Sequence, residues 1–92
     1  MTGIVLYTKN YCPYCKRAKA LLTRKGITFT EYDIQDSDDL VEEMIERSGG
    51  RRTVPQIFIG DQHIGGANDM FELDKLGGLD PLLKPYKNKA CA

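Results

Sequence analysis

Short apolar runs that alternate with segments of helical spacing limit the fold of this chain more than any other feature of its sequence. Ile4–Thr8 is apolar and rich in β-branched residues, which predicts a buried strand. In residues 13–25, apolar or small side chains recur at helical spacing with basic residues between them, and Gly26 ends this amphipathic helix. Residues 27–33 alternate in polarity and predict a second strand. Two strands joined through one helix form a parallel pair.

The second half of the chain continues this alternation and then changes it. Residues 37–47 carry apolar side chains on one helical face, and acids occupy the first turn, where the helix dipole favours them. Residues 56–59 and 63–64 predict two strands joined by a short turn, and such a hairpin is antiparallel. A third helix is expected over residues 68–76. The order β-α-β-α-β-β-α predicts an α/β fold, a small mixed four-stranded sheet flanked by helices.

The end of the chain is expected to add one short turn and a tail. Asp80 has the character of a helix cap and Pro81 that of a first helical position, for a turn that ends at Leu83. At 92 residues the chain has the length of one domain, which we assign to residues 1–84, with a polar tail over residues 85–92.

The charges balance overall but are segregated along the chain. Thirteen basic and thirteen acidic residues give a net charge of zero, whereas nucleic-acid binders usually carry a basic excess, so we expect no nucleic-acid partner. Residues 1–25 nevertheless hold six basic and no acidic residues, and residues 26–50 hold eight acidic and one basic.

The apolar segments are too short for a membrane protein. No apolar run reaches the ~18 residues of a membrane span. The short patch at residues 4–6 lacks the charged lead-in and the cleavage site of a signal peptide. We therefore expect a cytoplasmic protein without a membrane partner.

Cys12 and Cys15 are separated by two residues at the expected start of the first helix. Pro13 suits the first helical position, so Cys12 becomes the N-cap, with its sulfur facing the unpaired N–H groups of Tyr14 and Cys15. These groups, the helix dipole and nearby basic residues stabilise a thiolate, and we expect Cys12 to be the nucleophile at neutral pH. Cys15, one turn deeper, can resolve a mixed disulfide on Cys12, so the pair predicts thiol–disulfide exchange. The nearby basic residues are Lys9, Lys16 and Arg17.

The remaining thiol and the only histidine offer weaker alternatives. A closed zinc site needs four ligands, but beyond the pair the chain offers only Cys91 near its end and His63 in a strand, without paired spacing. We therefore expect no metal site. Cys91 fits an idle exposed thiol or an intermolecular disulfide formed on oxidation, and His63 fits a structural or solvent-facing side chain.

Two further segments could border the cysteine pair. A cis bond before Pro55 would open the backbone of Val54 to pairing with a cysteinyl peptide, but only about 5–6% of X–Pro bonds are cis, so the sequence alone favours trans. Gly65 and Gly66 let the backbone approach a ligand and then open a helix, whose N-terminus binds carboxylates. Simple turn chemistry explains this glycine pair as well.

Three motifs in order resemble a dithiol glutaredoxin of the small bacterial type, over about residues 4–83. They are Tyr7-Thr8-Lys9 ahead of Cys12-Pro13-Tyr14-Cys15, then Thr53-Val54-Pro55-Gln56-Ile57-Phe58-Ile59, then Gly65-Gly66 with Asp69. The resemblance implies a thioredoxin-like fold and a cis peptide before Pro55. It also implies glutathione as a co-substrate, with no bound cofactor.

The resemblance also implies a role for each matching residue. Cys12 would be the nucleophile and Cys15 its resolving partner. Glutathione would lie with its glycyl end against the first loop, its cysteinyl part along the backbone before the third strand, and its γ-glutamyl end at the start of the third helix. There Asp69 would meet the α-amino group. The residues implied in glutathione binding are Lys9, Tyr14, Arg52, Thr53, Val54, Pro55, Gly66, Ala67, Asn68 and Asp69.

The chain departs from the family pattern at three places. Ala67 and Asn68 stand where the family often has Cys or Ser and then Asp or Ser. The second helix has no Gln or Arg before its end to face the glycine carboxylate, so Lys9 and Arg52 would carry that charge. The loop Gly49-Gly50-Arg51-Arg52 is one residue longer than in the family pattern, which leaves open whether Arg51 or Arg52 contacts glutathione.

The function that the resemblance implies is glutathione-dependent reduction of protein disulfides and of glutathione mixed disulfides. Its partners would be glutathione, disulfide-containing or glutathionylated proteins with ribonucleotide reductase as one candidate, and indirectly glutathione reductase and NADPH. We expect a monomer. One alternative is a thioredoxin-like redoxin reduced by a flavoprotein reductase. The other is a binder of a [2Fe–2S] cluster held with glutathione between two subunits, which Pro13 disfavours.

Overall fold

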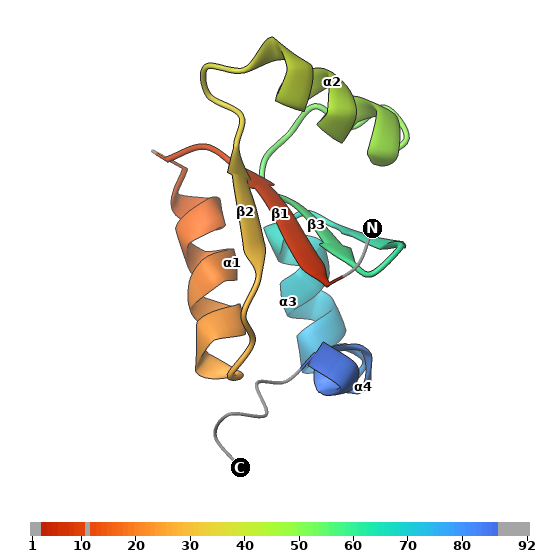
Figure 1. Cartoon of the computed structure of the whole chain (residues 1–92). Coiled ribbons are helices and arrows are strands. Elements are labelled where there is room, and N and C mark those ends of the chain that lie inside the picture. Colours follow the sequence, from red (N-terminus) through yellow and green to blue (C-terminus); the bar gives the residue numbers. More distant parts are fainter. Residues whose placement is uncertain (1–2, 11, 87–92) are drawn as a thin grey trace.

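The computed structural model describes residues 3–10 and 12–86, and its helices and strands follow the predicted order (Figure 1). The elements are β1 (Ile4–Thr8), α1 (Pro13–Arg24), β2 (Thr30–Asp33), α2 (Asp38–Arg47), β3 (Gln56–Ile59), β4 (Gln62–Gly65), α3 (Ala67–Lys75), α4 (Leu79–Leu83) and a 3₁₀ turn (Lys84–Tyr86). None of the helices in this part of the chain is long and apolar enough to cross a membrane.

The four strands form one mixed sheet in the order β2-β1-β3-β4. Strands β1 and β2 are parallel, as expected for a crossover through α1, and β3 is antiparallel to both β1 and β4. The predicted mixed four-stranded sheet is therefore confirmed. In this arrangement the end of β1, the start of β3 and the end of β4 meet at one edge of the sheet.

Helices cover both faces of the sheet, and each face has its own core. Helices α1, α3 and α4 pack on one face, and α2 packs on the other (Figure 1). The first core consists of Ile4, Leu6, Ala18, Leu21, Leu22, Ile27, Ile57, Ile59, Ala67, Met70, Leu79 and Leu83. The second consists of Val5, Tyr7, Ile34, Met44 and Phe58.

Helix α1 begins and ends where its sequence favours an end. Pro13 occupies its first turn, where a missing N–H costs no helical hydrogen bond. Gly26 has φ of +75°, a left-handed conformation that glycine adopts without steric cost. The Ile27 N–H then donates to the Leu22 carbonyl at 3.0 Å and closes a Schellman-type end. Helix α1 therefore begins at Pro13, after a short loop from the end of β1 at Thr8.

The structure differs from the sequence prediction most clearly at the start of β2, at the start of α4 and in the tail. Strand β2 begins at Thr30 rather than at residue 27. Helix α4 begins at Leu79, so Asp80 is not its cap, and Pro81 is tolerated because it still lies in the first turn. Tyr86, expected in the tail, packs against the first core. The rest of the tail, including Cys91, lies outside the described residues.

Candidate active site

Cys12 is the N-cap of α1, as predicted, and the structure has both Cys12 and Cys15 as free thiols. The Cys12 side chain is half-buried and does not bond to the N–H groups of α1. Its thiol instead donates to the Val54 carbonyl, with Sγ and oxygen 3.8 Å apart. The predicted cap bonds are thus wrong for this form, because a protonated sulfur carries a hydrogen and turns to an acceptor.

Cys15 is fully buried below Cys12. Burial raises the pKa of the Cys15 thiol to about 11, and its hydrogen bond with Cys12 adds to the rise. A thiol with this pKa is protonated at neutral pH. Cys15 is therefore a poor first nucleophile, and of the two it is Cys12 that incoming molecules can reach.

A pocket of about 310 Å³ lies beside the cysteines, at the edge where β1, β3 and β4 meet. Its walls come from the start of α1, the loop before β3 and the start of α3. Eight of the ten residues implied in glutathione binding line it; Lys9 and Arg52 do not. The lining residues are Tyr14, Arg51, Thr53, Val54, Pro55, Gly66, Ala67, Asn68 and Asp69.

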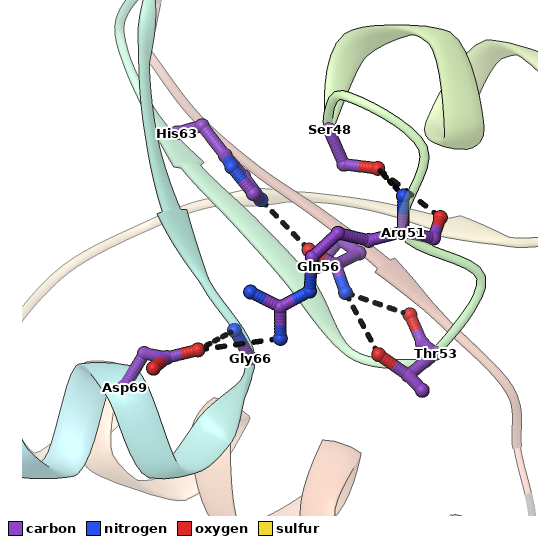
Figure 2. Close-up of polar contacts among 7 residues, drawn as sticks. All are labelled: Ser48, Arg51, Thr53, Gln56, His63, Gly66 and Asp69. Carbon is purple, nitrogen blue, oxygen red and sulfur yellow. Dashed lines mark hydrogen bonds and ion pairs between the residues drawn. The ribbon is translucent and has the colours of Figure 1, made fainter.

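Arg51 rather than Arg52 reaches this pocket. Figure 2 shows the Arg51 side chain extending from the loop toward Asp69, where Nη2 and Oδ2 are 3.4 Å apart. The buried Ser48 hydroxyl holds the Arg51 backbone, because it accepts from the N–H and donates to the carbonyl, both at 3.1 Å. Arg52 instead lines a separate hollow on α2, together with Asp38, Glu42 and Glu46.

The backbone before β3 and the start of α3 form facing walls of the pocket. The bond between Val54 and Pro55 is cis, which confirms the implication of the resemblance and corrects the trans form favoured by the sequence alone. Gly65 has φ of +117°, and a Cβ there would collide with the Asp69 carboxylate. That carboxylate accepts the Gly66 N–H at 2.8 Å, so the glycine pair brings Asp69 to the pocket rim.

Tyr14 and the basic face of α1 form the outer border of the site. The Tyr14 side chain is 48% exposed, and the Arg17 guanidinium lies 5.7 Å from the centre of its ring. Lys9 is in the loop between β1 and α1, where its carbonyl accepts the Cys12 N–H at 3.2 Å. Two basic residues, Lys9 and Arg17, thus stand on the loop and the helix that flank Cys12.

A second hollow, of about 580 Å³, lies on α2 and is lined by Arg47 and four carboxylates, without a nucleophile. Among residues 3–10 and 12–86, no three metal-ligating side chains come together.

The site can be compared with known proteins. A family model described as Glutaredoxin matches residues 4–64. The chain belongs to the glutaredoxin family. Glutaredoxin 3 of Escherichia coli K12 is 60% identical over 84 residues, which cover 91% of this chain and 100% of that protein.

Solved glutaredoxins share the fold. The solution structure of a glutaredoxin from Brucella melitensis has a TM-score of 0.78 at 52% identity, covering 96% of this chain and 95% of that one. A crystal structure of a buckwheat glutaredoxin–glutathione complex has a TM-score of 0.83 at 31% identity, covering 92% of this chain and 81% of that one. This glutaredoxin, of glutaredoxin 3 type, has the thioredoxin-like fold and is a glutathione-dependent thiol–disulfide oxidoreductase, with glutathione as its co-substrate.

Sequence reasoning missed two residues behind the pocket wall of this glutaredoxin. Gln56 is fully buried and bonds both to Thr53 and to His63 (Figure 2). The signal for Gln56 was present, because it is the one polar residue in the otherwise apolar run of β3. A buried polar side chain in such a run needs partners. His63 gave no comparable signal, because a strand histidine is common at the surface.

Proposed function

We propose that Cys12 is the nucleophile and Cys15 the resolving thiol of this glutathione-dependent oxidoreductase. One observation carries the proposal: Cys12, the half-buried thiol, lies at the N-terminus of α1 and contacts Val54, which lines the pocket. The fully buried Cys15 lies one helical turn away. An accessible sulfur backed by a protected one suits two successive exchange steps.

With a glutathionylated protein, the thiolate of Cys12 attacks the glutathione sulfur of the mixed disulfide. A Cys12–glutathione disulfide forms, and the protein sulfur leaves as a thiolate that takes up a proton. A second glutathione thiolate then attacks the glutathione sulfur on Cys12. Glutathione disulfide is released and the Cys12 thiolate is restored, so each step breaks one disulfide and forms one.

With a protein disulfide, Cys12 attacks one of its sulfurs and forms a mixed disulfide. Cys15 then loses its proton and attacks the Cys12 sulfur, which releases the second protein thiol and leaves a disulfide between the two cysteines. Two glutathione molecules reduce it. Glutaredoxins have potentials of roughly −200 to −230 mV, within reach of the cytosolic glutathione pool.

The pocket would hold the glutathionyl group in an extended form. Backbone groups of Thr53 and Val54 lie outside the sheet ladder, whose register with β1 starts at Gln56, and can pair with the cysteinyl part. The N-terminus of α3 suits the γ-glutamyl carboxylate, and Asp69 suits the α-amino group. Arg51, rather than Arg52, would supply positive charge for the glycine carboxylate of glutathione, together with Lys9.

Separate substitutions of the two cysteines test this assignment. Cys12→Ser should abolish reduction of both a glutathionylated peptide and a protein disulfide. Cys15→Ser should keep the first activity and lose the second. Reduction by glutathione with glutathione reductase, followed through NADPH consumption, should far exceed reduction by a thioredoxin reductase. Full activity of Cys12→Ser would overturn the assignment.

We also propose that the protein works as a monomer in the cytoplasm, with ribonucleotide reductase among its candidate targets. Support comes from the pocket, which one chain completes by itself. Mixed disulfides trapped by Cys15→Ser in cell extract, identified by mass spectrometry, would name the targets. Light scattering of the reduced protein would give the mass in solution, and a dimer would contradict the monomer.

A further inference from the structure

The buried side chain of Gln56 links the pocket wall to His63. Its Nε2 donates to the Thr53 carbonyl at 2.9 Å and to the Thr53 hydroxyl at 3.1 Å. Its Oε1 lies 2.7 Å from Nε2 of His63. Figure 2 shows the three side chains in one chain of contacts, from β4 across β3 to the loop before it. Every polar atom of the buried amide therefore has a partner.

The chain of contacts fixes the positions of the hydrogens. A carbonyl oxygen only accepts, so the amide nitrogen of Gln56 must face Thr53 and the amide oxygen must face the histidine. His63 must then carry a hydrogen on Nε2. Burial, with a smaller contribution from the charge of Arg51, lowers the pKa of His63, which favours the neutral ring. The contact with the Gln56 oxygen then selects the Nε2–H tautomer.

His63 is itself held firmly. It is paired with Phe58 in the ladder between β3 and β4, and the two rings lie 4.9 Å apart and tilted by 32°. Phe58 is buried in the second core. The imidazole is therefore placed by the sheet and not by the loop that it supports.

The loop before β3 depends on such support. Thr53 is exposed, and its stretch lies outside the sheet ladder. Ser48 holds the loop at Arg51, and Gln56 holds it at Thr53. The adjacent Val54 carbonyl contacts the thiol of Cys12. Where the Thr53 carbonyl points thus determines how the pocket wall lies relative to the nucleophile.

We propose that His63 is a positioning residue for glutathione recognition: its Nε2–H orients the Gln56 amide, which holds the Thr53–Val54 backbone in place at the pocket. This inference rests on the proposed function, in which that backbone pairs with the glutathionyl group. Loss of the donor leaves the Gln56 oxygen unpaired, so the amide can turn, and a turned amide sets two oxygens against each other at Thr53.

Kinetics with a glutathionylated peptide test the inference. His63→Phe keeps an aromatic ring on Phe58 and removes the donor; it should raise KM about 2- to 10-fold, the loss of one hydrogen bond, with kcat nearly unchanged. Gln56→Met should raise KM at least as much. If His63 acts through Gln56, adding His63→Phe to Gln56→Met should change KM no further. The neighbouring exposed residue gives the control, Gln62→Ala, with wild-type KM.

The tautomer of the His63 ring can be measured directly on the wild-type protein. His63 is the only histidine, so a long-range ¹H–¹⁵N spectrum of its ring is unambiguous and should show Nε2 protonated and Nδ1 not. An Nδ1–H tautomer, or an unchanged KM in His63→Phe with active wild type, overturns the inference alone. A wild type that fails to reduce the glutathionylated peptide with glutathione overturns the proposed function instead.

Discussion

At the scale of single residues, Cys12 and Cys15 are three positions apart yet differ sharply in environment. With its pKa raised to about 11, chiefly by burial, the Cys15 thiol stays protonated at pH 7. Iodoacetamide at pH 7 should therefore label Cys12 and leave Cys15 unlabelled, as read by peptide mass spectrometry. Equal labelling of the two cysteines at pH 7 would contradict the buried position of Cys15.

Glu31 is a single residue through which the stability of the fold should depend on pH. The Thr8 hydroxyl, 2.6 Å from its Oε2, and the Lys19 ammonium, at 2.9 Å, lower the pKa of the Glu31 carboxyl. A lowered pKa stabilises the fold above the unfolded value of about 4.3, and that contribution disappears as pH falls through the folded value.

Glu31→Gln should accordingly lower the free energy of unfolding by roughly 1 kcal/mol or less at pH 7. In urea titrations the difference from wild type should shrink as pH falls below the unfolded value of about 4.3 and through the lowered folded pKa of Glu31, where Glu31 itself becomes protonated. Glu72→Gln, at an exposed position of α3, serves as control. A stability difference between wild type and Glu31→Gln that grows at low pH would contradict this prediction.

The residues of the site were predictable where they belong to motifs. They were unpredictable where residues distant in the sequence determine the position of a side chain. The motifs placed the cysteines and the residues of both pocket walls. The position of Arg52 could not be read from sequence, because the hollow that it lines is completed by residues of α2 that only folding brings there. The turn of the Cys12 thiol toward Val54 likewise depends on a residue 42 positions away.

At the scale of elements, local side chains stabilise the start of α2. Ser37 caps it, with its Oγ accepting the Leu40 N–H at 3.3 Å, and Asp38 and Asp39 occupy the first turn. Ser37→Ala should lower the free energy of unfolding by about 1 kcal/mol, whereas Ser37→Asp should keep most of it. Denaturant unfolding of both variants measures this. Equal losses in the two would mean that the cap is not the cause.

Element boundaries were less predictable than element types. Residues 27–33 alternate like a full strand, but the ladder with β1 starts only at Thr30. Ile27 forms an isolated bridge and packs in the first core. Helix α4 begins before Asp80 because Leu79 is fully buried and draws the turn toward α3. In both cases packing against distant elements overrides local capping and alternation.

At the scale of the whole molecule, two cores hold the sheet between its helices. Leu22 is fully buried in the first core, while Leu76 is 77% exposed. Leu22→Ala should lower the free energy of unfolding by about 2–5 kcal/mol, and Leu76→Ala should change it by less than about 0.5 kcal/mol. Denaturant midpoints give both values, and similar losses would show that Leu22 lies outside the core.

The molecule also separates its charges in space. The basic helix α1 and the acidic helix α2 pack on opposite faces of the sheet. Cys12 therefore lies at the start of the basic helix, whose charge suits the negatively charged glutathione. The acids of α2 balance the total without surrounding the nucleophile.

The covalent intermediate on Cys12 tests the central claim most directly. Cys15→Ser incubated with glutathione disulfide should gain a glutathionyl group that maps to the Cys12 peptide, and reduced glutathione should then remove it. This outcome would show that the accessible thiol accepts glutathione at its sulfur. A Cys12 peptide that stays unmodified under these conditions would contradict the account.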